Sequence, residues 1–248
     1  MIALFCEFET IPRECNRKIM NIYSDGTYFK SNASWDQEHS PYKARLVIEL
    51  LNDIPAKSIL EVGCGAGEIT KILSCHFPDI QFSGYDISTD AENFWDGKGS
   101  SNLSFYCSDV LESGKQVDVI LCLDVFEHID DYIGFLEKLK LHGLFFVFKI
   151  PMDMNVLKLM TRGLAYARSE VGHIHYFNEW SAKATLVDCG YEIEVAKLSP
   201  AFLNVPPDNF RQWLAVIPRI LAHFLLGGGL ACKLLGGYSL MVRAKAKK

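Results

Sequence analysis

Short apolar runs alternate with segments of helical periodicity along most of this 248-residue chain. Runs with the length and composition of strands occupy residues 57–63, 80–88, 102–110, 117–123, 143–151, 191–198 and 238–245. Helical spacing marks residues 40–55, 68–77, 132–140 and 178–190. Several of the strands contain continuous apolar runs, which is typical of strands covered on both faces. The alternation predicts an α/β fold with a doubly wound, mostly parallel sheet and additional helical cap elements.

Two of the expected helices carry clear end signals. Ser40 is the expected N-cap of the first, with Pro41 at its first helical position. Asn178 is the expected cap of the last, and Gly190 lies just past its end. Between residues 102–110 and 117–123 no long helix is apparent, so we expect a short loop there.

Residues 201–236 break the alternation because they are strongly apolar. About 20 apolar residues are enough to cross a bilayer. Pro218, Arg219, His223 and the glycines at 227–229 interrupt the run, so we expect no transmembrane span. We expect an amphipathic helical pair that forms a wall of the substrate site, and contact with a membrane surface or a lipid-linked substrate is the alternative.

Length and composition describe a single globular domain. We divide residues 1–248 into an N-terminal flap or cap (1–40), a cofactor-binding core (41–200), a helical insertion (201–236) and a last strand with a basic tail (237–248). The net charge of −5 provides no basic field for nucleic acid. The eight cysteines are scattered without a CxxC pair, and residues 1–18 do not read as a secretory signal. We therefore expect a cytoplasmic protein with reduced thiols.

The stretch ILEVGCGAGEI places Gly63, Gly65 and Gly67 directly after an apolar strand. A dinucleotide fingerprint would need a third glycine where Glu68 stands, and a Walker loop would need a following Lys and Ser or Thr. Glu61 and Glu68 flank the turn with negative charge, which disfavours phosphates. S-adenosylmethionine fits better, because its carboxylate can accept helix N-terminal amides and its sulfonium tolerates acidic and aromatic neighbours.

Polar residues at the ends of the next strands extend this site. Asp86 lies 23 residues after Gly63, where an acid can accept both ribose hydroxyls, and Asp109 could accept from the adenine amino group. A helix cap is the commoner role of such an aspartate. Ligands of parallel sheets bind outside the carboxyl ends of the strands, so these segments converge. The residues expected to bind the cofactor are Glu61, Gly63, Cys64, Gly65, Gly67, Tyr85, Asp86, Ile87, Ser108, Asp109, Val110, Leu123 and Asp124.

These motifs together resemble the class I S-adenosylmethionine-dependent methyltransferases over residues 41–198. The resemblance implies a Rossmann-like sheet of seven strands whose last strand runs antiparallel beside the fifth. It also implies that Glu61 and the glycine turn hold the amino-acid part, Asp86 the ribose and Asp109 the adenine. S-adenosylhomocysteine would be the product.

The acceptor is expected to be a small molecule, hydrophobic or lipid-linked, and O-methylation is favoured. A neutral histidine suits removal of a hydroxyl proton. Ubiquinone and polyketide O-methylating enzymes, which residues 171–177 resemble, carry a histidine in such a stretch. We rank His175 first, then His173, then His128, and each has a structural alternative as a cap or loop support. We expect no metal site, because no third ligand is apparent near the histidines, and we expect Asp153 on the surface.

Two other functions are alternatives to the small-molecule methyltransferase hypothesis. A non-catalytic S-adenosylmethionine-binding subunit would bind the cofactor without transferring the methyl group. A nicotinamide-dependent oxidoreductase is disfavoured by Glu68 and by the lack of a second mononucleotide half. Trp35 or Tyr28 could shield the sulfonium from a flap, with Lys43 near the carboxylate.

Overall fold

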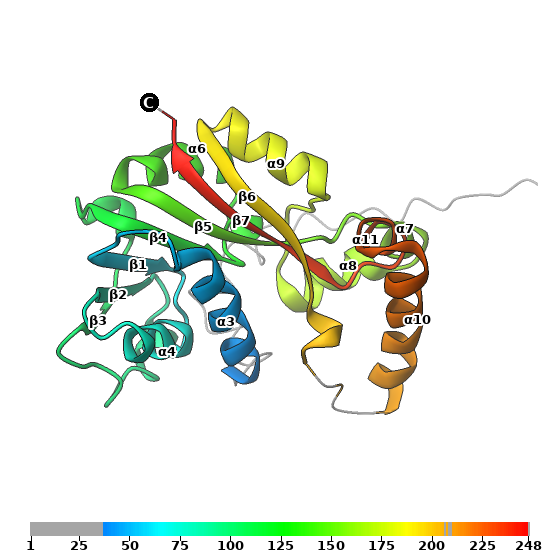
Figure 1. Cartoon of the computed structure of the whole chain (residues 1–248), viewed down its shortest axis with the longest axis horizontal. Coiled ribbons are helices and arrows are strands. Elements are labelled where there is room, and N and C mark those ends of the chain that lie inside the picture. Colours follow the sequence, from blue (N-terminus) through cyan, green and yellow to red (C-terminus); the bar gives the residue numbers. More distant parts are fainter. Residues whose placement is uncertain (1–36, 206, 208–209, 248) are drawn as a thin grey trace, which may run out of the picture.

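A single seven-stranded sheet organises the computed structural model, which describes residues 37–205, 207 and 210–247 (Figure 1). The strand order is β3-β2-β1-β4-β5-β7-β6. The strands are β1 Ser58–Val62, β2 Gln81–Asp86, β3 Leu103–Cys107, β4 Val117–Leu123, β5 Gly143–Pro151, β6 Tyr191–Pro200 and β7 Tyr238–Ala246. Strands β1 to β5 pair in parallel, and β7 runs antiparallel between β5 and β6. The predicted seven-stranded fold with an inserted antiparallel last strand is confirmed.

Helices cover both faces of this sheet. The α-helices are α3 Ser40–Leu51, α4 Glu68–His76, α5 Thr89–Glu92, α6 Tyr132–Leu139, α7 Val156–Met160, α8 Gly163–Tyr166, α9 Glu179–Asp188, α10 Phe210–Leu226 and α11 Gly228–Leu235. Short 3-10 segments lie at Gln37–His39, Val110–Glu112, Phe126–His128, Lys140–His142 and Ala201–Leu203, and a π-turn lies at Ala167–Val171. Figure 1 shows α3 and α4 on one side of the sheet and α6 and α9 on the other.

Strand β4 shows why the sheet is buried on both faces. Its successive side chains point to opposite faces. Val119, Leu121 and Leu123 pack in the core beneath α3 and α4. Ile120 and Cys122 pack in the core beneath α6 and α9. A continuous apolar run is therefore required at this position, as the sequence pattern predicted.

The helix-end predictions are partly confirmed. Asn178 caps α9 in a capping box with Ser181, and Gly190 follows with a φ of 85°. Ser40 is not the cap of α3: it is already helical, and His39 precedes it without a side-chain cap bond. The crossover between β3 and β4 contains only a 3-10 turn, in which the amide of Leu111 donates to the side chain of Asp109.

The apolar insertion forms the helical pair α10 and α11, separated by Gly227 with a φ of 78°. Pro218 lies inside α10 and does not end it. Within the part of the chain that the structure describes, no helix combines the length and apolar character needed to cross a membrane. The N-terminal flap with Tyr28 and Trp35 lies outside the described residues.

Candidate functional site

A cavity of about 860 Å³ opens where the carboxyl ends of β1, β2 and β4 meet. The loops after these strands, the start of α3 and the segment around His173 line it. Twelve of the thirteen residues predicted to bind the cofactor line this cavity: Glu61, Gly63, Cys64, Gly65, Tyr85, Asp86, Ile87, Ser108, Asp109, Val110, Leu123 and Asp124. Gly67 lies outside the lining. The strand topology thus gathers residues that are far apart in the sequence into one wall.

The glycine turn after β1 needs glycine at three positions. Gly63, Gly65 and Gly67 have φ values of 66°, 52° and 75°, which other residues rarely adopt. A Cβ on Gly63 would lie 2.7 Å from Cγ2 of Val125, and one on Gly67 would lie 2.5 Å from Cε1 of Phe105. Gly67 therefore allows the turn to pack against β3, whereas Gly63 and Gly65 expose backbone to the cavity.

Two side chains brace the turn from outside. The indole of Trp95 donates to the carbonyl of Gly65 at 2.8 Å, and the ammonium of Lys98 donates to that of Ala66 at 2.8 Å. Lys98 also pairs with Glu68 at 3.0 Å. The sequence showed no cation in the turn, but the fold supplies one from 30 residues further along the chain and offsets the charge of Glu68.

Asp86, at the end of β2, is positioned by backbone amides. Its Oδ2 accepts from the amide of Gly65 at 2.8 Å and its Oδ1 from that of Ser88 at 2.9 Å. Burial raises its pKa, and these amide bonds oppose the rise. A carboxylate has about four acceptor sites. The two bonds therefore leave capacity for a pair of ligand hydroxyls, which is the arrangement that a ribose requires.

Glu61, at the end of β1, lies buried beside the turn and accepts a hydrogen bond from the hydroxyl of Thr70. Burial raises its pKa to about 7, against the bond from Thr70 and the charge of Lys43. The carboxyl group is therefore close to half-protonated at neutral pH.

This shift predicts a loss of stability with rising pH. The pKa of Glu61 is higher in the folded protein than in the unfolded chain, so protonation of Glu61 stabilises the fold. This stabilisation is full below about pH 4.5 and is lost as the pH rises through 7. Between pH 5 and 8 the free energy of unfolding of the wild type should fall by about 2 to 3 kcal/mol relative to Glu61→Gln. Denaturant unfolding at several pH values measures this, with exposed Glu49→Gln as the matched control. Parallel curves for the wild type and Glu61→Gln would contradict the shift.

A partly buried cluster of charges follows β4. Asp124, in the left-handed conformation with a φ of 57°, contacts Nζ of Lys149 at 2.6 and 2.7 Å and Nζ of Lys43 at 3.0 Å. Burial alone would raise the pKa of Asp124, but the two ammonium groups outweigh it and hold the pKa well below its usual range. Sequence analysis missed Lys149, although a single lysine within the apolar β5 run was a usable signal.

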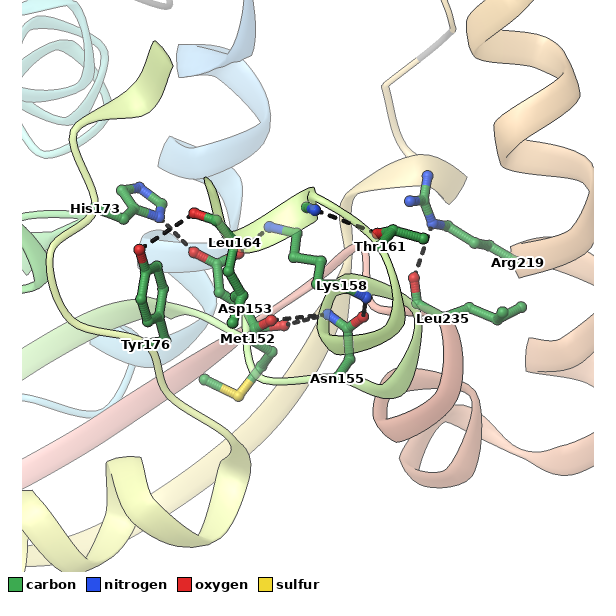
Figure 2. Close-up of polar contacts among 11 residues, drawn as sticks. Met152, Asp153, Asn155, Lys158, Thr161, Leu164, His173, Tyr176, Arg219 and Leu235 are labelled. Carbon is green, nitrogen blue, oxygen red and sulfur yellow. Dashed lines mark hydrogen bonds and ion pairs between the residues drawn. The ribbon is translucent and has the colours of Figure 1, made fainter. Parts of the chain in front are cut away.

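His173 forms a buried pair with Asp153, the loop residue after β5 (Figure 2). The Asp153 carboxylate accepts from Nδ1 of His173 and from Nζ of Lys158. Burial would raise the pKa of Asp153, but these two partners lower it overall, so the group is ionised. The expectation of a surface position was wrong: Asp153 is 5% exposed. Because Nδ1 donates to the carboxylate, Nε2 is the nitrogen left to accept a proton.

The other two histidines differ in position. His128 lines the cavity with His173, their ring centroids are 4.9 Å apart, and its Nδ1 lies 3.0 Å from the carbonyl of Gly172. Burial and the neighbouring His173 lower the pKa of His128 to about 4. His175 is not part of the lining. Its Nε2 lies 2.9 Å from the carbonyl of Ile129, which ties it to the loop after β4.

Glu127 was missed by sequence analysis. Its side chain is fully buried, and both carboxyl oxygens lack a hydrogen-bond partner among the described residues. Burial raises the pKa of Glu127 well above the usual range, and the negative charge of Asp124 raises it further. Its carboxyl group and ring nitrogens of His128 and His173 lie within 4.8 Å of one another. Glu127 is therefore a third group with metal-ligand chemistry near two of the histidines, which the sequence did not indicate. The prediction that no metal is bound stays a prediction.

The helical pair contributes little to the cavity. Of residues 201–236, only Ala201 and Val205 line it, and both precede α10. The expected wall is therefore limited to the segment that connects β6 to α10, within the described residues.

Comparison with known proteins places these features in a family. Residues 35–195 match the methyltransferase domain family. A malonyl-[acyl-carrier protein] O-methyltransferase of Acetivibrio thermocellus is 30% identical over 120 residues, covering 45% of this chain and 42% of that protein. A ubiquinone biosynthesis O-methyltransferase of Rickettsia bellii is 29% identical over 107 residues, covering 40% and 45%. The chain thus spans less than half the length of these curated relatives.

Solved structures share the architecture. Magnesium protoporphyrin IX methyltransferase from Synechocystis PCC 6803, with bound SAH, superposes with a TM-score of 0.58 at 15% identity and covers 94% of this chain and 100% of its own. The plantazolicin methyltransferase BpumL, in complex with a monoazolic desmethylPZN analog and SAH, gives a TM-score of 0.62 at 16% identity, covering 95% of this chain and 96% of its own. These identities show a common fold alone. Because the family match extends over well more than half of the sequence, the chain belongs to the methyltransferase domain family.

Proposed function

We propose that this protein transfers a methyl group from S-adenosylmethionine to a hydroxyl group of a small molecule. The observation that carries the proposal is that one cavity joins the glycine turn and Asp86 to the His173–Asp153 pair. Cofactor residues and a histidine suited to accept a proton thus lie in the same space. S-adenosylmethionine supplies the chemistry when bound, because its sulfonium carries a methyl group open to in-line displacement.

The residues present fit that cofactor. Gly63 and Gly65 expose backbone where an amino-acid tail needs close approach, and Asp86 retains acceptor capacity for the ribose. Asp109 lines the cavity but also accepts from the amide of Leu111 at 2.8 Å, so its carboxylate would serve the turn and the adenine together. No lysine or arginine lies within the turn itself, which continues to disfavour a diphosphate ligand.

His173 is the base that the geometry favours. With S-adenosylmethionine held by the glycine turn and Asp86, methylation of a hydroxyl acceptor would release its proton to Nε2 of His173. Asp153 holds the opposite nitrogen and stabilises the charged ring, as a carboxylate does in a Ser-His-Asp triad. His128 lies beside it in neutral form, and His175, ranked first from the sequence, lies outside the lining. Positioning of the acceptor against the methyl group would supply much of the remaining acceleration.

The acceptor is proposed to be apolar or attached to a lipid or carrier. Apolar side chains line the cavity together with His173, among them Ile129, Val171, Ile174, Ala201 and Val205. The relatives in Acetivibrio thermocellus and Rickettsia bellii are named for malonyl-[acyl-carrier protein] and ubiquinone biosynthesis. Both names support a small acceptor and O-methylation for this chain. The domain match also disfavours the nicotinamide-dependent alternative.

The ribose assignment predicts a measurable loss of affinity. Asp86→Ala should weaken binding of S-adenosylhomocysteine by about 1 to 3 kcal/mol, because two ligand hydroxyls lose their acceptor and the amide of Gly65 loses its partner. Isothermal titration calorimetry measures the change. Asp79→Ala, which removes an exposed aspartate before β2, is the matched control. Unchanged affinity in Asp86→Ala would exclude this role, and preferential binding of NADH by the wild type would overturn the cofactor assignment.

A further inference from the structure

The outward face of α10 is apolar. Seven of its large apolar side chains are exposed, and six of them share one side of the helix: Trp213, Leu214, Ile217, Leu221, Phe224 and Leu225, with exposed fractions of 45 to 79%. At about 100° per residue they fall within an arc of roughly 120°. A helix on the surface of a water-soluble domain normally presents polar residues on that side. The face of α10 that points to solvent therefore has the composition of a buried one.

Two polar side chains of α10, those of His223 and Arg219, point inward instead. Nδ1 of His223 lies 2.9 Å from the hydroxyl of Tyr238, at the start of β7. Nε of Arg219 donates to the carbonyl of Leu235 at 3.3 Å, at the end of α11 (Figure 2). Together with the edge contact between the rings of Phe202 and His223, these bonds fix the rotation of the helix. The apolar arc is therefore held outward by specific contacts.

Neighbouring helices extend the same surface. Helix α11 packs against both α10 and α7, and α7 packs against α8. Figure 1 shows these four helices gathered at one end of the sheet, and we call them the apolar lobe. Among the described residues, 13 of the 22 exposed large apolar side chains belong to it. Besides the six side chains on the outward face of α10, these are Val156, Leu157, Leu159, Met160, Tyr166, Leu226 and Leu230. Exposed apolar patches of this extent commonly mark an interaction surface.

The charge of the lobe is opposite in sign to that of the whole chain. The four helices and the turns within each pair, residues 156–166 and 210–235, contain five lysines and arginines and no acidic residue, whereas the chain has a net charge of −5. Of these cations Arg162 and Lys233 are exposed, whereas Lys158 pairs with Asp153 and Arg219 points inward. A cationic surface would repel a second copy of itself across a symmetric interface. Exposed apolar and aromatic side chains on helices that carry exposed cations and no acidic residue match an anionic lipid surface, where they enter the headgroup region while Arg162 and Lys233 meet the phosphates.

We propose that the apolar lobe binds the surface of an anionic membrane, with the outward arc of α10 inserted among the lipid headgroups. The segments that join the lobe to the sheet also line the cavity, through Val171 and Ile174 on one side and Ala201 and Val205 on the other. The acceptor end of the cavity would then lie beside the bilayer. This binding does not depend on the proposed methyl transfer, so each can be tested without the other.

Flotation with lipid vesicles tests the proposal on the full chain. Vesicles of phosphatidylcholine with about 30% phosphatidylglycerol should bind the wild type, and raising the salt concentration should weaken binding because the electrostatic part is screened. The double variant Leu221→Glu/Leu225→Glu should bind at least about tenfold less, because two inserted side chains are replaced by anions. Leu141→Glu/Leu144→Glu is the matched control: it makes the same change at exposed leucines at and just before the amino end of β5, away from the lobe, and should bind as the wild type does.

Three results would overturn the proposal. The wild type could fail to float with anionic vesicles, or Leu221→Glu/Leu225→Glu could bind vesicles as well as Leu141→Glu/Leu144→Glu does. Analytical ultracentrifugation could instead show a lipid-free dimer that Leu221→Glu/Leu225→Glu dissociates, which would assign the lobe to a second copy. Circular dichroism and thermal unfolding establish that each variant is folded. A blue shift of tryptophan fluorescence on adding vesicles that is lost in Trp213→Phe and retained in Trp180→Phe gives an independent positive result.

Discussion

Replacing Gly65 with valine is expected to abolish binding of S-adenosylhomocysteine, with a loss of more than about 100-fold in affinity. Gly65 has a φ of 52°, where a β-branched side chain is strongly disfavoured. Its amide donates to Asp86 and its carbonyl accepts from Trp95, so a backbone shift at this position disturbs both partners. The new side chain would also enter space that the cofactor's amino-acid tail needs. Isothermal titration calorimetry with S-adenosylhomocysteine measures the effect.

A second glycine separates backbone strain from loss of the site. Gly114 has a φ of 62°, no atom lies within 4 Å of a Cβ built on it, and it is not among the residues that line the cavity. Gly114→Val should therefore cost stability but keep normal affinity. If Gly65→Val binds the ligand within a few-fold of the wild type, the glycine turn is not the cofactor cradle. Equal losses of affinity in Gly65→Val and Gly114→Val would show that the effect comes from a folding defect.

Turnover is expected to fall about 10²- to 10⁴-fold in His173→Ala, the range typical of removing a general base. Asp153→Asn should lower kcat substantially with little change in KM, because the amide cannot stabilise the charged ring but leaves the cavity intact. Added imidazole should restore part of the activity of His173→Ala. Steady-state kinetics with an acceptor found by screening hydroxylated apolar compounds measures these effects.

His175→Ala is the matched control for the base. Its ring contacts the loop after β4 and stays outside the cavity lining, so kcat should remain within a few-fold of the wild type. A larger loss in His175→Ala than in His173→Ala would restore the ranking suggested by the sequence. Dialysis against EDTA should leave turnover unchanged. Activity that disappears on chelation and returns with a divalent cation would instead assign Glu127, His128 and His173 to a metal site.

The strand and helix order was predictable because each element carries a local signal. Continuous apolar runs such as β4 are long enough to identify a strand buried on both faces. Helix boundaries were less certain, as Ser40 shows: its capping chemistry suited the N-cap, but the preceding 3-10 turn placed it inside the helix. Local propensity sets the kind of element, while its exact ends depend on the residues packed beside it.

The cofactor side of the candidate site was predictable for a topological reason. Parallel strands bring their carboxyl ends to one edge, so residues that follow β1, β2, β3 and β4 converge whatever the details of packing. Twelve predicted residues line the cavity on that account. Gly67 is the exception, because a turn has two sides and the sequence does not say which one faces the ligand. It packs against Phe105 instead.

By itself the sequence determined the α/β fold, the glycine turn after β1 and the wall of the cavity that follows from strand order, because each depends on periodicity or on short-range backbone demands. Only the tertiary structure decided which histidine has an ionised partner, that Asp153 and Glu127 are buried, and that Lys149 and Lys98 neutralise distant carboxylates. The outward rotation of α10 was decided there too. These features depend on side chains that meet across long stretches of chain, and their charge and burial are set by that packing, which no local pattern records.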